Sequence, residues 1–296
     1  MIKITLKKNN SLKDKLLNKI LLFSTFAFVA ISSIFIVFEM YWILLVPIAL
    51  LVIYMAFFKL NYLIYFIVFS TPLAINIEHI NGGFSLSVPT EPLLFGIMLL
   101  FFFRLLYAGY NKKIISHPVS IALLFNLGWI FVTMLTSTEP IVSLKFLVAR
   151  LWFVIPMYFV GVLIFEKKEN AIRFLWLYFI ALCIIVVYTL TRHVANGMSE
   201  HSSHWVMEPF YRDHTSYGAI LALFIPIIIG LSSLKYKSKI VNYMAFALFG
   251  LALVGIIFSY TRAAWLGVFA ILILYIVILL NIKFFKLGRF SYLKTN

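Results

Sequence analysis

Residues 258–267 read Phe258-Ser259-Tyr260-Thr261-Arg262-Ala263-Ala264-Trp265-Leu266-Gly267 and contain the only charge in the apolar run from Ile240 to Asn281. As one helix, this run would extend roughly 63 Å at about 1.5 Å per residue, about twice the hydrocarbon thickness of a bilayer. The run therefore predicts two membrane spans that fold back on each other. Arg262 falls at the hairpin between them, at a membrane face, beside the hydroxyl groups of Tyr260 and Thr261.

The composition excludes a soluble globular domain. Of the 296 residues, 64% are apolar, whereas soluble domains are about half apolar and a quarter charged. The net charge of +15 does not indicate a nucleic-acid-binding protein, because its basic residues lie between apolar runs, as the positive-inside rule requires. The single cysteine, Cys183, excludes an intramolecular disulfide and a thiolate metal cluster.

Ten apolar runs have about the length that crosses a bilayer. They lie at 20–38, 41–58, 60–75, 92–107, 118–136, 146–165, 171–190, 214–233, 240–259 and 264–281. The sequence thus predicts an all-α integral membrane protein with about ten transmembrane helices, in one multi-pass domain over residues 1–296. Lysines before the first run predict an uncleaved first helix and a cytoplasmic N-terminus.

The charges divide unequally between the two predicted sides. The inner segments hold 20 of the 25 basic residues, and most acidic residues lie outside. The five outer basic residues are Lys145, Arg150, Arg192, Arg212 and Arg262. Because outer loops normally avoid lysine and arginine, we interpret the outer face as the functional one.

Arg150 and Arg262 are the first candidates for a site. A helix beginning near Ile141 would place Arg150 roughly 13 Å along its axis, where an arginine costs about 2.5–3.5 kcal/mol unless it meets a partner or a wet cavity. The alternatives are that Arg150 extends to the headgroups and that Arg262 meets lipid phosphate at a hairpin tip. Two guanidinium groups at one depth would suit bidentate binding of a pyrophosphate.

A second polar stretch, Tyr211-Arg212-Asp213-His214-Thr215-Ser216-Tyr217-Gly218, precedes another apolar run. Asp213 is placed to cap the following helix, and Thr215 or Ser216 to satisfy other free amides. His214 is a candidate acid–base or a hydrogen-bond donor to a sugar hydroxyl, with a structural role at the helix start as the alternative.

No metal site is expected. His201 and His204 lie three residues apart near Glu200 and Glu208, but the loop offers no third ligand at a defined spacing. Gly82-Gly83 is interpreted as a turn and not a phosphate loop, because no helix with a lysine follows it.

The two polar stretches carry a resemblance to a known family. Tyr211 to Ala219, the apolar run with Pro226, and Ser259 to Gly267 resemble the O-antigen ligase and O-antigen polymerase family of bacterial inner-membrane proteins. Arg150 in Val148-Ala149-Arg150-Leu151-Trp152 matches the arginine that such proteins place on an earlier helix. The resemblance covers about residues 140–281.

This resemblance implies an integral-membrane glycosyltransferase of the C-type fold class. Such an enzyme takes a glycan from undecaprenyl pyrophosphate at the periplasmic face and joins it, with inversion, to a lipid A core or a growing polysaccharide. Periplasmic arginines hold the pyrophosphate in place of a metal, a role that fits Arg150 and Arg262 with help from Lys145 and Arg212. Asp213, Tyr260 and Thr261 are further candidates for substrate contacts. No cofactor is implied. Family members usually continue into further spans and a periplasmic loop with a functional histidine, so the chain is expected to be a truncated member.

A transporter or flippase of a lipid-linked glycan is the alternative. It would predict ionisable residues near mid-membrane and broken helices in corresponding halves of the chain. Here the charges gather at the outer ends of the runs and no internal repeat is visible. The sequence therefore favours the transferase, with membrane lipids, a lipid-linked glycan and a glycan or lipid A core acceptor as partners.

Overall fold

The computed structural model describes residues 2–80, 84–232 and 239–292. The chain divides into two compact units, Met1–Leu63 and Ile64–Asn296. The predicted turn at Gly82-Gly83 and three of the predicted inner lysines, Lys235, Lys237 and Lys294, lie outside the described residues.

The first unit contains two apolar helical segments. α1 (Ile2–Val37) includes the predicted first span, and a short 3-10 helix, η1 (Tyr41–Leu45), leads into α2 (Val46–Phe58). Pro47 lies in the first turn of α2, where its missing N–H costs no helical hydrogen bond. No residue of α2 is buried, as expected for an apolar helix that faces lipid.

The second unit is a bundle of helices with one β-hairpin. α3 (Leu60–Ser70) begins at the end of the first unit and continues into the second. The other elements are β1 (Ile75–Ile80), β2 (Phe84–Val88), α4 (Thr90–Ala108), α5 (Lys112–Ile115), α6 (Pro118–Leu135), α7 (Pro140–Val154), η2 (Ile155–Val160), α8 (Gly161–Ile164), α9 (Lys168–Ala195), α10 (Glu200–Ser203), α11 (His214–Ser232), α12 (Lys239–Ile257) and α13 (Arg262–Tyr292). η2 is a π-helical segment, and its Pro156 lacks the N–H that a regular helix would use.

The predicted class, a multi-pass α-helical membrane protein, is confirmed. Among the described residues, seven helices are long and apolar enough to cross a membrane, and three shorter apolar helices cover Ile43–Phe58, Leu60–Ser70 and Arg262–Ile278. The number of ten spans stays a prediction. The run predicted as a span at 60–75 is wrong in its extent, because α3 ends at Ser70, two residues before Pro72.

The segment expected as an outer loop at 76–91 forms most of an antiparallel hairpin. Ile75 pairs with Val88, Asn76 with Ser87 and Ile77 with Leu86. The sequence signal for this structure was an alternation of apolar and polar residues over 75–78 and again over 84–88. The prediction of a purely helical fold omitted it.

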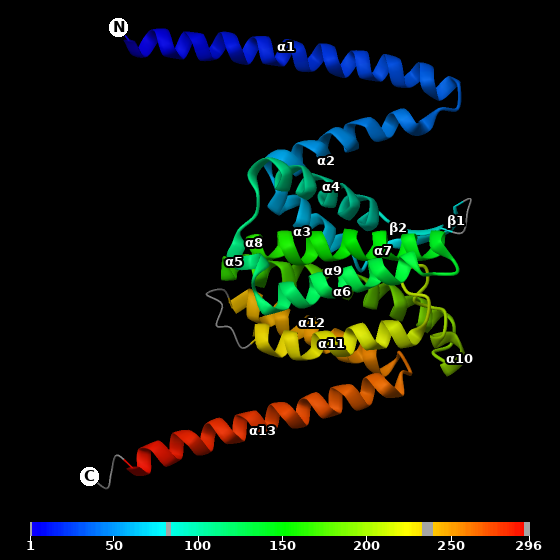
Figure 1. Ribbon diagram of the computed structural model, residues 1–296, viewed down its shortest axis with the longest axis vertical. Coiled ribbons are helices and arrows are strands. Elements are labelled where there is room, and N and C mark those ends of the chain that lie inside the picture. The colour runs from blue at the N-terminus through cyan, green and yellow to red at the C-terminus, as the bar shows by residue number, and fades with distance from the viewer. Residues whose placement is uncertain (1, 81–83, 233–238, 293–296) are drawn as a thin grey trace. The chain divides into compact units, whose positions relative to one another are not determined.

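The predicted outer segments of the second unit gather at one edge of its helices (Figure 1). The hairpin, the α6–α7 turn, α10 and the α12–α13 turn lie together, on the right in Figure 1, while α5 and α8 lie at the opposite edge. This arrangement follows from helices that run alternately in opposite directions. It brings segments far apart in the sequence to one face.

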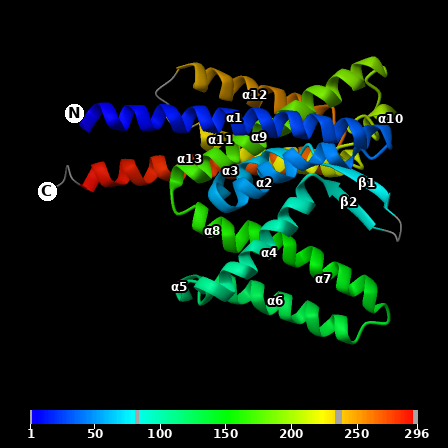
Figure 2. The ribbon, with the colours of Figure 1, turned by 90° about the horizontal axis from the view of Figure 1, so that it is seen from above.

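The helices of this unit pack in two groups (Figure 2). In the first group, α7 packs on α4 and α6, around a cluster of Met98, Leu127, Val154, Ile155 and Phe159. In the second group, α11 packs on α9, α12 and α13. The two polar stretches belong to this second group.

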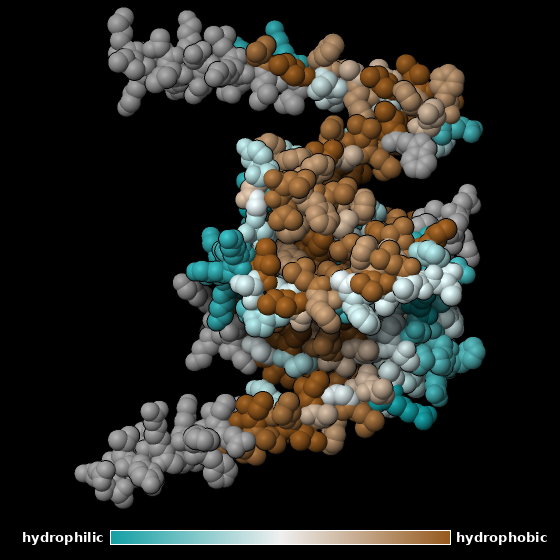
Figure 3. All heavy atoms as spheres, in the orientation of Figure 1, coloured by the Kyte–Doolittle hydropathy of each residue, from teal (hydrophilic) through white to brown (hydrophobic). Residues whose placement is uncertain are grey.

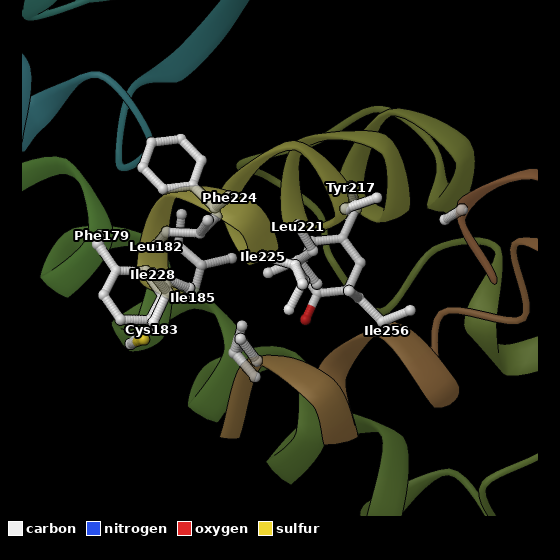
Figure 4. Packing of buried hydrophobic residues seen from close by; sticks show 14 of the residues in the cluster. Phe179, Leu182, Cys183, Ile185, Tyr217, Leu221, Phe224, Ile225, Ile228 and Ile256 are labelled. Atoms are coloured by element: carbon white, nitrogen blue, oxygen red, sulfur yellow. The ribbon is translucent and has the colours of Figure 1, made fainter. Parts of the chain in front are cut away.

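The second group has a tightly packed core (Figure 4). Phe179, Leu182 and Ile185 of α9 pack with Leu221 and Ile225 of α11, all fully buried. Gly255 of α12 permits this close approach, because a Cβ there would lie 2.9 Å from Val186 Cγ1 and 3.1 Å from the Tyr217 hydroxyl oxygen. The core therefore provides a rigid base for the residues at the outer edge.

The exposed surface of the long helices, which faces away from the bundle core, is strongly apolar (Figure 3). Large side chains such as Phe125, Leu266 and Phe269 are 72%, 70% and 64% exposed. Soluble proteins rarely leave apolar surface of this extent uncovered. We therefore interpret this surface as the one that lipid covers.

Candidate functional site

The two polar stretches are in direct contact. The Thr261 hydroxyl donates a hydrogen bond to the backbone oxygen of His214, at 2.7 Å. Gly218, one turn along α11, faces the same side chain, and a Cβ there would lie 2.7 Å from Thr261 Cβ and Oγ1. The start of α11 and the α12–α13 turn therefore form one site.

Hydrogen bonds fix the α12–α13 turn, Phe258–Thr261, at several points. The Tyr260 hydroxyl donates to Met198 O at 3.0 Å, and the Ser259 hydroxyl donates to Ile256 O at 2.7 Å. Trp265 Nε1 also donates to Ile256 O, at 2.9 Å. Tyr260 has a φ of 52°, a left-handed conformation that is uncommon for a bulky residue and persists only where the surroundings hold it. The hydroxyls of Tyr260 and Thr261 thus both serve to position the turn.

Arg262 is the first residue of α13, and its side chain is exposed. The first turn of α13 has no acidic residue. Within the described part of the chain, the Arg262 guanidinium forms no hydrogen bond or ion pair. A helix N-terminus carries partial positive charge and free amides, so together with this guanidinium it favours an anion.

Asp213 caps α11, as the sequence predicted. Its Oδ1 accepts hydrogen bonds from the Ser216 amide and the Thr215 hydroxyl. The expectation that Thr215 or Ser216 would satisfy other free amides is wrong: among the described residues no amide donates to either hydroxyl, and both hydroxyls donate to Asp213. The hydrogen bonds from Thr215 and Ser216 lower the pKa of the Asp213 carboxyl below its ordinary value.

Replacing Asp213 with alanine should lower the free energy of unfolding by about 1 kcal/mol, and Asp213→Asn should retain most of the cap. Because the folded-state pKa is lowered, the carboxylate's contribution is present at neutral pH, above the unfolded-state pKa of about 4. It is lost as the pH falls through the lowered folded-state pKa. Thermal unfolding of purified protein at several pH values checks this. Equal acid sensitivity of the wild type and Asp213→Asn would contradict it.

His214 lies beside a second histidine. Its half-buried ring packs edge-on against the ring of His204, with 4.2 Å between the centroids. Its Nδ1 is buried and has no hydrogen-bond partner in the described structure. The sequence had grouped His204 with His201, and only the packing of the loop on α11 reveals the pair His204–His214. In the described ranges, no three His, Cys, Asp or Glu residues are placed to hold a metal ion.

Arg192, at the end of α9, has a structural role that the sequence did not reveal. Its Nη1 donates to the Tyr188 hydroxyl at 3.0 Å, to Val206 O at 3.2 Å and to Glu208 O. The guanidinium carbon also lies 5.4 Å and 5.3 Å from the ring centroids of Tyr188 and Trp205. Arg192 therefore holds the segment before α11 onto α9.

Arg192→Ala should loosen residues 204–210, because the carbonyls of Val206 and Glu208 lose a charged donor. Each such hydrogen bond contributes about 1.5–3 kcal/mol. We expect faster cleavage of this segment in limited proteolysis, with only partial recovery in Arg192→Lys, which lacks the planar fork. His201→Ala is the matched control, because His201 is exposed in α10, just before this segment. Cleavage at the rate of this control would show that Arg192 does not hold the segment.

His193 is a further residue that sequence reasoning did not assign. It is fully buried in the last turn of α9, and its Nε2 lies 3.0 Å from Ser199 O. Its ring packs edge-on against Phe258 and Tyr260, at 6.1 Å and 5.9 Å between centroids. His193 thus links the end of α9 to the α12–α13 turn. The sequence offers no signal for this contact beyond the place of His193 near a helix end.

The remaining predicted residues lie on other elements. α7 begins at Pro140, so Arg150 lies roughly 15 Å along the helix, as expected. The Arg150 side chain is exposed and has no hydrogen bond or ion pair with any described residue. Lys145 is half-buried on the same helix, and Arg212 is exposed beside Asp213. Because α7 and α13 belong to different helix groups, the structure does not by itself bring Arg150 to Arg262.

Comparisons with known protein families, with characterised proteins and with solved structures give no match to this chain. The functional assignment therefore depends on the residue motifs and on the geometry of the site.

Proposed function

We propose that this chain is all or part of a membrane-embedded glycosyltransferase. In this proposal, a glycan moves from undecaprenyl pyrophosphate to an acceptor hydroxyl at the outer face of a bacterial inner membrane. The observation that supports it most is Arg262, an exposed guanidinium at a helix N-terminus, on a turn anchored to α11 by Thr261. This arrangement suits an anionic leaving group.

The reaction is a single displacement. The acceptor hydroxyl attacks the anomeric carbon, the bond from that carbon to the pyrophosphate oxygen breaks, and the pyrophosphate leaves with the electron pair. Arg262, joined by Arg150 when the two helix groups approach, stabilises the negative charge on the departing oxygen. Attack from the opposite side inverts the anomeric configuration.

His214 is our candidate for the base that takes the acceptor's proton. It directly follows Asp213, and its backbone oxygen is bound to Thr261, so its imidazole lies near the turn that bears Arg262. Asp213 itself is a poor base, because its carboxylate is committed to the cap of α11. The acceptor belongs to the class of lipid A cores or growing polysaccharides, and Lys145 and Arg212 are candidates for further contacts with the substrate.

The full-length protein in vesicles tests the function, with a fluorescent glycan on undecaprenyl pyrophosphate as donor. Transfer of the glycan to an acceptor, with release of undecaprenyl pyrophosphate, supports the proposal. Movement of intact donor across the vesicle without bond cleavage would instead support a lipid-linked glycan transporter. If the protein neither transfers the glycan nor moves the donor across the vesicle membrane, both functions are overturned.

The proposal also fixes an orientation. In a Cys183→Ala background, cysteines introduced at Thr138 and Asn196 should react with a membrane-impermeant thiol reagent from the periplasm, because both positions are exposed at the predicted outer edge. Cysteines at Ser116 and Glu169, exposed at the opposite edge, should not react. The reverse labelling pattern would place the site on the cytoplasmic side.

A further inference from the structure

The β1–β2 hairpin has one apolar side and one polar side. Side chains alternate across a strand, so the paired residues Ile75–Val88 and Ile77–Leu86 share a side. We call these four residues the apolar hairpin face. The opposite side carries the pair Asn76–Ser87, in which the Ser87 hydroxyl donates to Asn76 Oδ1.

The apolar hairpin face is largely uncovered by the rest of the chain. Ile75, Ile77 and Val88 are 45%, 46% and 36% exposed, and Leu86 is half-buried. An isolated two-stranded hairpin is marginally stable in water and needs its apolar side covered. Something outside the described residues therefore covers this face.

The surroundings of the hairpin favour lipid. β2 packs against α4, which begins two residues after β2 ends. The exposed side of α4 carries Phe95, Leu99 and Phe102, spaced as one helical stripe that lipid would cover. Apolar atoms also extend over this part of the surface in Figure 3. The apolar hairpin face therefore adjoins a lipid-facing surface.

The chemistry of the face also separates lipid from a protein partner. All four side chains are aliphatic, and none is the Tyr, Trp or Arg that usually anchors a protein interface. An open sheet edge limits the depth, because unpaired backbone groups are not tolerated in the hydrocarbon core. A hairpin of this kind fits only where water still reaches its edges.

We propose that the β1–β2 hairpin is a membrane-surface element. Its apolar hairpin face lies at the boundary between headgroups and acyl chains, in the leaflet on the same side of the bundle as the hairpin. Asn76 and Ser87 then face the aqueous side. The hairpin thereby fixes how deep the junction between α3 and α4 lies in the bilayer. This inference does not depend on the proposed transferase activity.

The test uses the full chain in nanodiscs of phosphatidylethanolamine and phosphatidylglycerol, with an environment-sensitive fluorophore on single cysteines in a Cys183→Ala background. Ile75→Cys, Ile77→Cys and Val88→Cys probe the apolar face, and Asn76→Cys probes the polar side. Phe125→Cys, in the middle of α6, is the deep lipid reference, and Thr138→Cys, in the α6–α7 turn, is the aqueous reference. Thermal unfolding identifies any variant that fails to fold.

We expect blue-shifted emission at positions 75, 77 and 88, with stronger quenching by lipids brominated near the headgroup than by lipids brominated near the chain end. The Phe125 reference should show the reverse order of quenching. Positions 76 and 138 should be quenched mainly by aqueous iodide. Three apolar-face probes that iodide quenches like position 138 would overturn the proposal. Shielding of those probes from both lipid and iodide would also overturn it, since a second copy or another protein would then cover the face.

Discussion

Replacing Arg262 with alanine is expected to lower glycan transfer by about 10²–10³-fold, the loss that follows removal of one donor to a developing anion. Arg262 is exposed at the start of α13 and is unpaired within the described structure, so its guanidinium is available to the pyrophosphate of the proposed donor. Arg262→Lys should remain strongly impaired, because lysine keeps the charge but loses bidentate binding. The assay is transfer from undecaprenyl-pyrophosphate glycan, with membrane insertion measured for each variant.

Arg104→Ala is the matched control, an exposed arginine of α4 at the opposite end of the bundle, and it should transfer at the wild-type rate. A normally inserted Arg262→Ala variant with near-wild-type transfer would show that Arg262 only meets lipid headgroups.

Arg150→Ala extends the test. If both arginines serve one leaving group, the double alanine variant loses less than the product of the single losses. If the loss of transfer in the double variant equals the product of the single losses, Arg150 does not act on the same leaving group as Arg262.

Gly218→Ala should destabilise the protein by about 1–3 kcal/mol, the usual cost of overpacking a well-packed site. The new Cβ would lie 2.7 Å from Thr261 Cβ and Oγ1 and 3.0 Å from Ser259 Oγ, so α11 and the α12–α13 turn must move apart. The same movement displaces Arg262, which follows Thr261 directly. We therefore expect a fall in transfer at temperatures where the variant is still folded. Thermal unfolding and the transfer assay together measure both effects.

Gly230→Ala is the control on the same helix. Nothing lies within 4 Å of a Cβ at Gly230, so this change should be neutral or stabilise α11 by up to about 1 kcal/mol. Thr261→Gly removes the two nearest of the three atoms that the new Cβ would meet, Thr261 Cβ and Oγ1. The double variant Gly218→Ala with Thr261→Gly should thus be less destabilised than the sum of the two single variants. Simple additivity would show that Gly218 and Thr261 are not in close contact.

The membrane class and several local features could be predicted from the sequence alone. Apolar runs fold as helices because nothing else satisfies their backbone in lipid, and every predicted run except 60–75 falls almost wholly within apolar helices. The cap at Asp213 and the position of Arg262 next to a turn were also predictable. Both depend on residues within one helical turn of each other.

The extent of some elements was decided by competing local signals. Pro72 shortens a segment that hydropathy alone predicts as a span, and the alternation within 75–78 and 84–88 favours strands over an irregular loop. These signals are present in the sequence. A hydropathy average over a long window conceals them, because it does not register single breakers or a period of two.

Local patterns in the sequence were enough to predict a multi-pass helical protein with an arginine beside the junction of two apolar helices and a capped helix that carries His214. The packing of helices and loops sets three features that no local pattern indicates: Thr261 binds the His214 backbone, His204 packs against His214, and Arg192 is hydrogen-bonded within the fold while Arg262 is exposed. These contacts join residues of different helices and loops, and they depend on the close approach of α9, α11 and α12 that Gly218, Gly255 and the buried core permit. Helical periodicity records which face of a helix is apolar but not which helix that face will meet.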